Sequence, residues 1–304
     1  MKIVSLLPSA TEIVFALGLG DQLEAVTDEC DYPAEARDKP VVSRSALPAG
    51  RPLSAREIDD AVRARMDQKD PLYLLDKALI QRIQPDVILA QDLCRVCAVP
   101  SGQVEDALSE LGVSSKVLSL DPSTLDEVLA CITTVGGALG AADRAEELVA
   151  SLRRRVDKVR RTALGVPSVR ALALEWSDPP FAGGHWIPEM VDMAAGTNLL
   201  TEKGQPSRQV TWRQIRDATP EVVVYMPCGY YLDEAREEAV KLYDNPEFAD
   251  TPAAREGNVF AVDATSYFSR PGPRIVDGLE ILAWTVHPDA YPEPPADTIA
   301  RVKR

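Results

Sequence analysis

The sequence has little positive charge and few aromatic side chains. Lys and Arg together number 33 against 47 Asp and Glu, which gives a formal net charge of −14, and Phe, Trp and Tyr make up 6% of the chain. Nucleic-acid binding needs clustered positive charge that neutralises phosphates. The charge balance therefore predicts no nucleic-acid partner for these 304 residues, whose 45% hydrophobic content is ordinary for a globular protein.

Long apolar runs and export features are also missing. No stretch of 18 uninterrupted apolar residues occurs, so the sequence predicts a protein that is not membrane-spanning. The apolar start is interrupted at Pro8, Ser9, Thr11 and Glu12, and no small-residue cleavage site follows. The five cysteines are odd in number and irregularly spaced, which does not fit a disulfide framework. Together these absences predict a reducing, cytoplasmic location.

Common catalytic motifs are absent as well. The sequence contains no Gly-x-Ser-x-Gly elbow, no phosphate-binding loop and no His-Glu-x-x-His zinc motif. A catalytic interpretation would use Glu175 and Asp178 as acid and base near His185, but paired carboxylates are common without chemistry. The sequence therefore predicts a protein that is not an enzyme.

Apolar strand-like runs alternate with helical patterns in both halves of the chain. One continuous helical pattern is expected over Leu72–Ile83, and another over Ala141–Leu164, which contains no Pro and no Gly. The second would be about 36 Å long at 1.5 Å per residue. We therefore predict an α/β fold of two Rossmann-like lobes with parallel sheets joined by a single long helix. The predicted boundaries are residues 1–140 for the N-terminal lobe, 141–164 for the helix and 165–304 for the C-terminal lobe.

Three segments carry a family resemblance. They are Ser5–Gly20, Met193–Leu199 and Ser269–Leu279. Each resembles the corresponding segment of the cobalamin- and iron-siderophore-binding proteins, which are the substrate-binding components of metal-chelate ABC importers and have the class III periplasmic-binding-protein fold with a helical backbone. The resemblance implies that the loop at Pro8 and Ser9 and the loop before Arg270 contribute to a ligand cleft between the lobes. Without an export signal, the chain is most similar to a cytosolic branch of this family.

Four cysteines follow expected strand ends, where ligands gather in α/β sheets. These residues are Cys30, Cys94, Cys97 and Cys228. The Cys-x-x-Cys spacing suits a thiolate-bound metal such as zinc or copper(I), an iron–sulfur cluster or a redox pair. Buried packing as small hydrophobic side chains and lining of a cleft without metal remain the other interpretations. Cys131 falls within an expected helix and is assigned to the core.

Aromatic side chains and one histidine also gather in the loops after the expected strands. The residues that we expect at a ligand site are Tyr32, Phe181, His185, Trp186, Tyr230, Phe268 and Arg270. A flat macrocycle needs apolar walls of this kind with a few polar groups. The imidazole of His185 is either a contact for iron or cobalt or a structural hydrogen-bonding group. Arg270 either binds an anionic group of the ligand or forms an internal ion pair.

The first functional prediction is a binding protein for a metal chelate, with cobalamin or a related corrinoid as the ligand, and no further cofactor is required. Its expected partner is an ABC permease or a cytosolic acceptor of the cofactor. The alternative is a cytosolic metal or redox protein, either an enzyme or a cofactor chaperone, that uses Cys94 and Cys97 in the same cleft.

Overall fold

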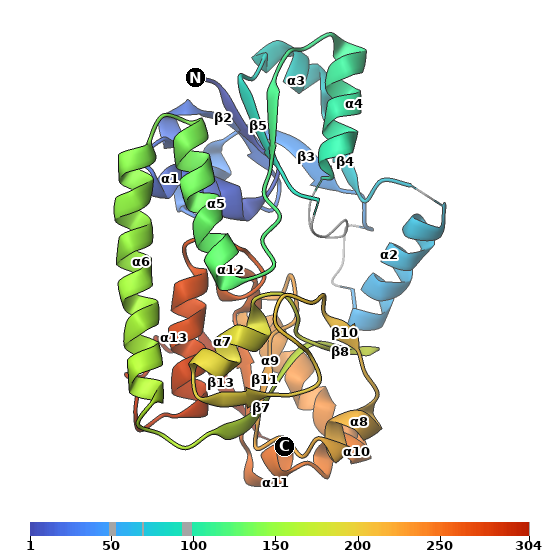
Figure 1. Cartoon of the computed structure of the whole chain (residues 1–304). Helices are drawn as coiled ribbons and strands as arrows, with labels where there is room; N and C mark the ends of the chain where they lie inside the picture. Colours follow the sequence, from blue (N-terminus) through green and yellow to red (C-terminus); the bar gives the residue numbers. More distant parts are fainter. Residues whose placement is uncertain (49–52, 69, 93–98, 304) are drawn as a thin grey trace. The chain divides into compact units, whose positions relative to one another are not determined.

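The computed structural model describes residues 1–48, 53–68, 70–92 and 99–303 (Figure 1). Contacts within the chain divide it into two compact units. The first unit comprises Met1–Pro122 and Leu129–Val149, and the second comprises Ser123–Val128 and Ala150–Arg304. Among the described residues, no helix combines the length and the apolar character that a membrane span requires.

The first unit is built on a sheet of six strands in the order β4-β3-β2-β1-β5-β6. All neighbouring strands pair in parallel except β4, which runs antiparallel to β3 at one edge. The strands are β1 (Ile3–Ser5), β2 (Leu23–Thr27), β3 (Val41–Ser45), β4 (Tyr73–Leu75), β5 (Val87–Ala90) and β6 (Lys116–Ser119). The central strands are buried apolar runs, as expected for a parallel sheet covered on both faces.

Besides part of the long helix described below, the first unit contains five helices or parts of helices among its described residues. They are α1 (Pro8–Ala16), α2 (Ala55–Gln68), α3 (Lys77–Ile83), α4 (Ser101–Leu111) and most of α5 (Leu125–Ala138), with two short 3-10 helices at Gly20–Gln22 and Ala34–Asp38. Helix α1 begins at Pro8, where the missing N–H needs no partner, and its residues from Pro8 to Val14 are buried. The loop after β1 is therefore held closely against the sheet.

The second unit contains a seven-stranded mixed sheet in the order β10-β8-β7-β11-β12-β13, with β9 also paired to β7. Strands β7, β11 and β12 are parallel neighbours, whereas β8, β10 and β13 add antiparallel pairs toward the edges. The strands are β7 (Val169–Ser177), β8 (Pro180–Ala182), β9 (Gly196–Asn198), β10 (Arg208–Gln209), β11 (Val222–Tyr225), β12 (Val259–Val262) and β13 (Ile299–Val302). The core around this sheet includes the fully buried Tyr225 and Phe248.

The helices of the second unit are mostly short. They are α7 (Ile187–Met193), α8 (Trp212–Asp217), α9 (Leu232–Lys241), α10 (Pro246–Ala249), α11 (Pro252–Glu256), α12 (Ala264–Tyr267) and α13 (Ile275–Val286), with a 3-10 helix at Leu242–Asp244. Side-chain caps fix several of their starts: Thr211, Asn245, Thr251 and Asp263 each accept a hydrogen bond from a backbone N–H in the first turn.

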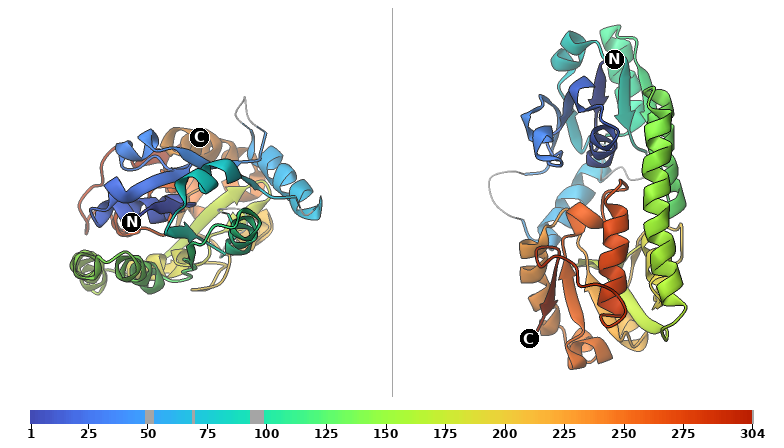
Figure 2. Two further views of the ribbon diagram at one scale, coloured as in Figure 1. Left: turned by 90° about the horizontal axis from the view of Figure 1, so that it is seen from above. Right: turned by 90° about the vertical axis from the view of Figure 1, so that its left-hand side faces the viewer.

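The long helix α6 (Ala142–Ala163) has 22 residues and continues without a break from the first unit into the second. The helix has an apolar seam that is buried at Leu152, Val156 and Val159. In the second unit the helix lies beside α13 (Figures 1 and 2), and Arg155 donates hydrogen bonds to Asp277 and Glu280 on that helix. The prediction of two α/β lobes and one long helix is confirmed by this fold.

One predicted element is wrong. The expected helix over Leu72–Ile83 is instead the edge strand β4 followed by α3. Tyr73, Leu74 and Leu75 pair with β3, and Asp76 then starts α3 by accepting a hydrogen bond from the Leu79 N–H at 2.8 Å. The pairing with β3 and the cap therefore override the apolar pattern.

Candidate functional site

The carboxyl ends of three parallel strands bring aromatic residues together in the second unit. Trp176 lies near the end of β7, Tyr230 lies in the loop after β11, and Phe268 follows the short helix after β12. The rings of Trp176 and Tyr230 meet edge to face with centroids 5.6 Å apart. The Tyr230 carbonyl accepts a hydrogen bond of 3.1 Å from the Thr265 N–H, which ties the β11 loop to the β12 loop. We call Trp176, Tyr230, His185, Trp186 and Phe268 the aromatic rim.

The remaining members of the aromatic rim come from the loop after β8. The indole Nε1–H of Trp186 donates a hydrogen bond of 2.9 Å to the Phe268 carbonyl, across 82 residues of sequence. The rings of His185 and Trp186 are tilted by 33°, with centroids 5.7 Å apart. Trp186 and Phe268 are buried, whereas His185 and Tyr230 are half-buried. The rim therefore has buried supports and partly exposed rings.

Burial sets the protonation of the two titratable rim groups. Removal from water lowers the pKa of His185 below its usual value, so the imidazole is neutral at pH 7. Burial, together with the carboxylates of Glu238 and Glu234, raises the pKa of Tyr230 to about 12. The phenol therefore keeps its proton and can donate a hydrogen bond.

Glu175 anchors the loop that carries His185. Its carboxyl group accepts hydrogen bonds from the Ser207 hydroxyl and from the Gly184 N–H, and burial raises its pKa above the usual value. Gly184 has no room for a side chain, because a Cβ there would lie 2.2 Å from the Ser207 nitrogen and 2.4 Å from the Pro206 carbonyl carbon. Glu175 is thus a positioning group for this loop.

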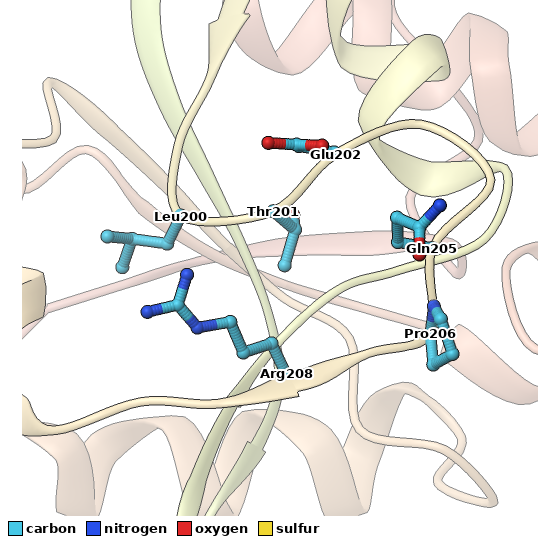
Figure 3. Close-up of a pocket in the computed structure, with 6 residues that line it drawn as sticks. All are labelled: Leu200, Thr201, Glu202, Gln205, Pro206 and Arg208. Carbon is cyan, nitrogen blue, oxygen red and sulfur yellow. The ribbon is translucent and has the colours of Figure 1, made fainter.

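A pocket of about 390 Å³ lies beside this loop (Figure 3). Its lining residues are Leu200, Thr201, Glu202, Gln205, Pro206 and Arg208. Figure 3 shows Glu202 on the loop side and Arg208 reaching in from β10. None of these residues was expected from the sequence, and the turn signals at Gly204 and Pro206 were the only local indication of a loop here.

Arg270 and Cys228 lie in the same unit, close in sequence to the rim. Arg270 is only 8% exposed, and the charges of Arg274 and Arg270 act on the half-buried carboxyl group of Asp263. Burial raises the pKa of Asp263, and hydrogen bonds from Ser266 oppose that increase. Cys228 is exposed in the loop after β11, and Phe181 is half-buried in β8.

The first unit holds the other predicted residues. Pro8 and Ser9 form the first turn of α1, and Ser9 is buried. The Cys30 sulfur lies 3.0 Å from the Thr11 hydroxyl oxygen and is also buried. Tyr32, in contrast, is 48% exposed.

The hypothesis of a thiolate-bound metal or a redox pair depends mainly on Cys94 and Cys97, which lie outside the residues that the structure describes. Cys30 belongs to the first unit and Cys228 to the second. Within residues 1–48, 53–68, 70–92 and 99–303, no group of three or more His, Cys, Asp or Glu side chains is arranged to hold a metal ion. The predicted thiolate site therefore stays a prediction.

Two α/β units, with one long helix that continues from the first into the second, make up this fold. A family model described as Periplasmic binding protein matches residues 3–265, and the chain belongs to this family. The family resemblance that we found in the three sequence segments is therefore confirmed.

Named relatives cover nearly the whole chain. An uncharacterised ABC transporter substrate-binding lipoprotein of Bacillus subtilis is 25% identical over 299 residues, which is 96% of this chain and 82% of the relative. A vitamin B12-binding protein of Vibrio cholerae is 24% identical over 283 residues, or 92% and 86% of the two chains. These relatives are named as binding proteins, which supports the prediction of a non-enzyme. They give no support to the expected cytoplasmic location.

Solved structures share the fold. A periplasmic heme binding protein of Pseudomonas aeruginosa matches with a TM-score of 0.70 at 23% identity, covering 100% of this chain and 98% of that one. The periplasmic vitamin B12 binding protein of Vibrio cholerae matches with a TM-score of 0.67 at 22% identity, covering 94% and 96%. At these identities the likeness shows the fold alone.

Proposed function

We propose that this protein binds a metal chelate with a flat macrocycle, a corrinoid such as cobalamin first of all, and delivers it to an ABC permease. The chelate is cargo, so no resident cofactor is required. The observation that carries the proposal is the aromatic rim, in which the Trp176 and Tyr230 rings pack edge to face. The His185 ring lies against Trp186, whose indole donates a hydrogen bond to the Phe268 carbonyl. Such rings supply apolar walls, and the neutral phenol and imidazole supply a few polar contacts.

Family membership supports the proposal from a second direction. The vitamin B12-binding relative spans 92% of this chain, and structures named for heme and vitamin B12 share its fold. The alternative of a cytosolic metal or redox protein gains no support from these relatives.

Direct titration tests the function. The purified protein is titrated with aquocobalamin, hemin and a ferric siderophore, with calorimetry and tryptophan fluorescence as measurements. We expect binding of the corrinoid at about micromolar affinity or tighter, which corresponds to about −8 kcal/mol. Affinity no tighter than millimolar for all three compounds would overturn the proposal.

A rim variant locates the site. Trp176→Ala removes an aromatic wall, and we expect binding to weaken at least about tenfold, as for aromatic residues that dominate binding sites. Leu164→Ala is the control, because it deletes an apolar side chain that is 88% exposed and outside the rim. Equal affinities of the two variants would place the ligand elsewhere.

A further inference from the structure

Three polar side chains that line the pocket in Figure 3 have no protein partner within the part of the chain that the structure describes. Glu202, Gln205 and Arg208 form no side-chain hydrogen bond or ion pair there, with one another or with any other described residue. Lys203, the cation next to Glu202 in the sequence, is paired instead with Glu189 at 2.5 Å. The pocket therefore offers a carboxylate, an amide and a guanidinium group to a ligand.

The loop that carries part of this pocket is fixed against the loop of the aromatic rim. The Thr201 hydroxyl donates to the Gly183 carbonyl at 2.7 Å. The Gly204 N–H donates to the His185 carbonyl at 2.9 Å, and the Gln205 carbonyl accepts the His185 N–H at 2.6 Å. The pocket is thus a neighbour of the rim within the second unit, and its loop is ordered before any ligand arrives.

A strand pair and two apolar residues complete the pocket. Arg208 lies opposite Ala182 of β8 in an antiparallel pair, which fixes its backbone. Leu200 has a φ angle of +72°, which a bulky side chain seldom adopts, and it packs against the core of the second unit. Leu200 and Pro206 line the pocket together with the polar side chains. A group that enters beside them loses part of its water, which strengthens its hydrogen bonds.

The two opposite charges restrict the chemical group that fits. Glu202 lines the pocket from the loop, and Arg208 lines it from β10 (Figure 3). An ionised carboxylate only accepts hydrogen bonds, whereas a guanidinium group only donates them. A ligand carboxylate would bind Arg208 but would be repelled by Glu202. A primary amide satisfies both residues, because its NH₂ group donates to the carboxylate and its oxygen accepts from the guanidinium group.

From this arrangement we infer that the pocket binds a primary amide side chain at the edge of the chelate, and that Glu202 and Arg208 select this amide over a carboxylate. The inference rests on the proposed function and specifies its ligand class. Corrinoids carry acetamide and propionamide side chains around the ring, whereas the porphyrin of heme carries propionates. The expected ligand is therefore an amide-bearing corrinoid.

A pair of corrinoids that differ in these side chains tests the inference. The full-length protein is titrated by calorimetry with dicyanocobinamide, which carries amides, and with dicyanocobyrinic acid, which carries carboxylates at the same positions. Cyanide fills both axial positions of cobalt in each compound, so the side chains alone distinguish them. We expect the amide compound to bind about tenfold more tightly or better, the range for hydrogen bonds to charged groups.

Two variants assign this selection to the pocket. In Glu202→Gln we expect the ratio of the two affinities to fall about fivefold, a modest change because Glu202 is exposed. The repulsion of the carboxylate compound is lost, while the glutamine oxygen still accepts from an amide. Arg208→Gln should weaken the binding of both compounds, because it removes the guanidinium donor to the oxygen that they share.

The control is Glu237→Gln, which removes the same charge from an exposed position on α9. It should keep the wild-type ratio. Equal ratios in Glu202→Gln and Glu237→Gln, or equal affinities of the wild-type protein for the two compounds, would overturn the inference while the proposed function stands. Binding of neither compound would also overturn the inference, and if aquocobalamin, hemin and the siderophore fail to bind as well, the proposed function is overturned with it.

Discussion

Glu175 lies in β7 with a buried carboxyl group whose pKa is raised by desolvation. The folded protein thus holds this proton more tightly than the unfolded chain, where the pKa is near 4.5. Unfolding releases the proton, so the contribution of this group to stability falls as the pH rises from about 4.5 through the raised pKa. We expect Glu175→Gln to remove this decline, so that the variant gains stability relative to the wild-type protein between about pH 4.5 and neutrality.

Urea denaturation at a series of pH values measures this difference. Glu237→Gln is the control, because Glu237 is an exposed carboxylate on α9. Its denaturation midpoints should run parallel to those of the wild-type protein. A constant offset between Glu175→Gln and the wild-type protein at every pH would contradict the expected linkage.

The residues of the candidate site were only partly predictable. His185, Trp186 and Tyr230 were predicted as ligand-site residues from their side-chain type alone, because aromatic residues make up only 6% of the sequence. The roles of Ser207 and Gln205 could not be found in this way. They depend on contacts with Glu175 and His185 that join distant segments of chain, and their side chains carry no distinctive chemistry.

At the scale of elements, α6 and α13 are joined by Arg155. Its guanidinium group donates to Glu280 at 3.0 and 2.7 Å and also to Asp277, and these partners raise its pKa. We expect Arg155→Ala to lower the free energy of unfolding by about 1 kcal/mol, a modest value because all three side chains are partly exposed. Thermal denaturation measures the loss, which should shrink at high salt concentration.

Arg154→Ala is the matched control on the same helix, since Arg154 is exposed. It should change stability by less than about 0.5 kcal/mol. If both variants are equally stable, the contacts of Arg155 do not hold α6 against α13.

Elements with a strong local pattern were predictable, and short paired strands were not. The segment Ala141–Leu164, which has no Pro or Gly, predicted both ends of α6 to within one residue. Its apolar residues recur with the period of a helix. Strands β8, β10 and β13 have only three, two and four residues. Their conformation comes from pairing with neighbouring strands, which single-sequence patterns do not contain.

At the scale of the whole molecule, α6 passes from the first unit to the second between Val149 and Ala150. Ala150→Pro would remove a hydrogen bond in the middle of this helix and clash with the preceding turn, without disturbing packing, because Ala150 is exposed. We expect a loss of about 3 kcal/mol or more in the free energy of unfolding, measured by urea denaturation with circular dichroism.

The control is Ala142→Pro, at the first residue of the same helix, where proline is well tolerated. It should cost much less than Ala150→Pro. Equal losses would mean that continuity of the helix at the unit boundary adds nothing to stability.

The overall architecture and family were predictable because they follow from repeated strand–helix alternation and from motifs near both ends of the chain. The membership of Ser123–Val128 in the second unit has no such signal. In this segment the Leu125 N–H donates a hydrogen bond to the buried Glu189 carboxylate, which also lies 2.5 Å from the Lys203 ammonium group. The sequence around Leu125 cannot predict a contact with a residue 64 positions away.

This interleaving of chain between the units constrains protein engineering. A chimera that takes one unit from a relative cannot be made with a single splice, because three junctions are needed, after Pro122, Val128 and Val149. The second and third of these cuts fall inside α5 and α6. Hybrid receptors with exchanged ligand specificity are therefore better built by grafting the loops of the aromatic rim onto an intact scaffold.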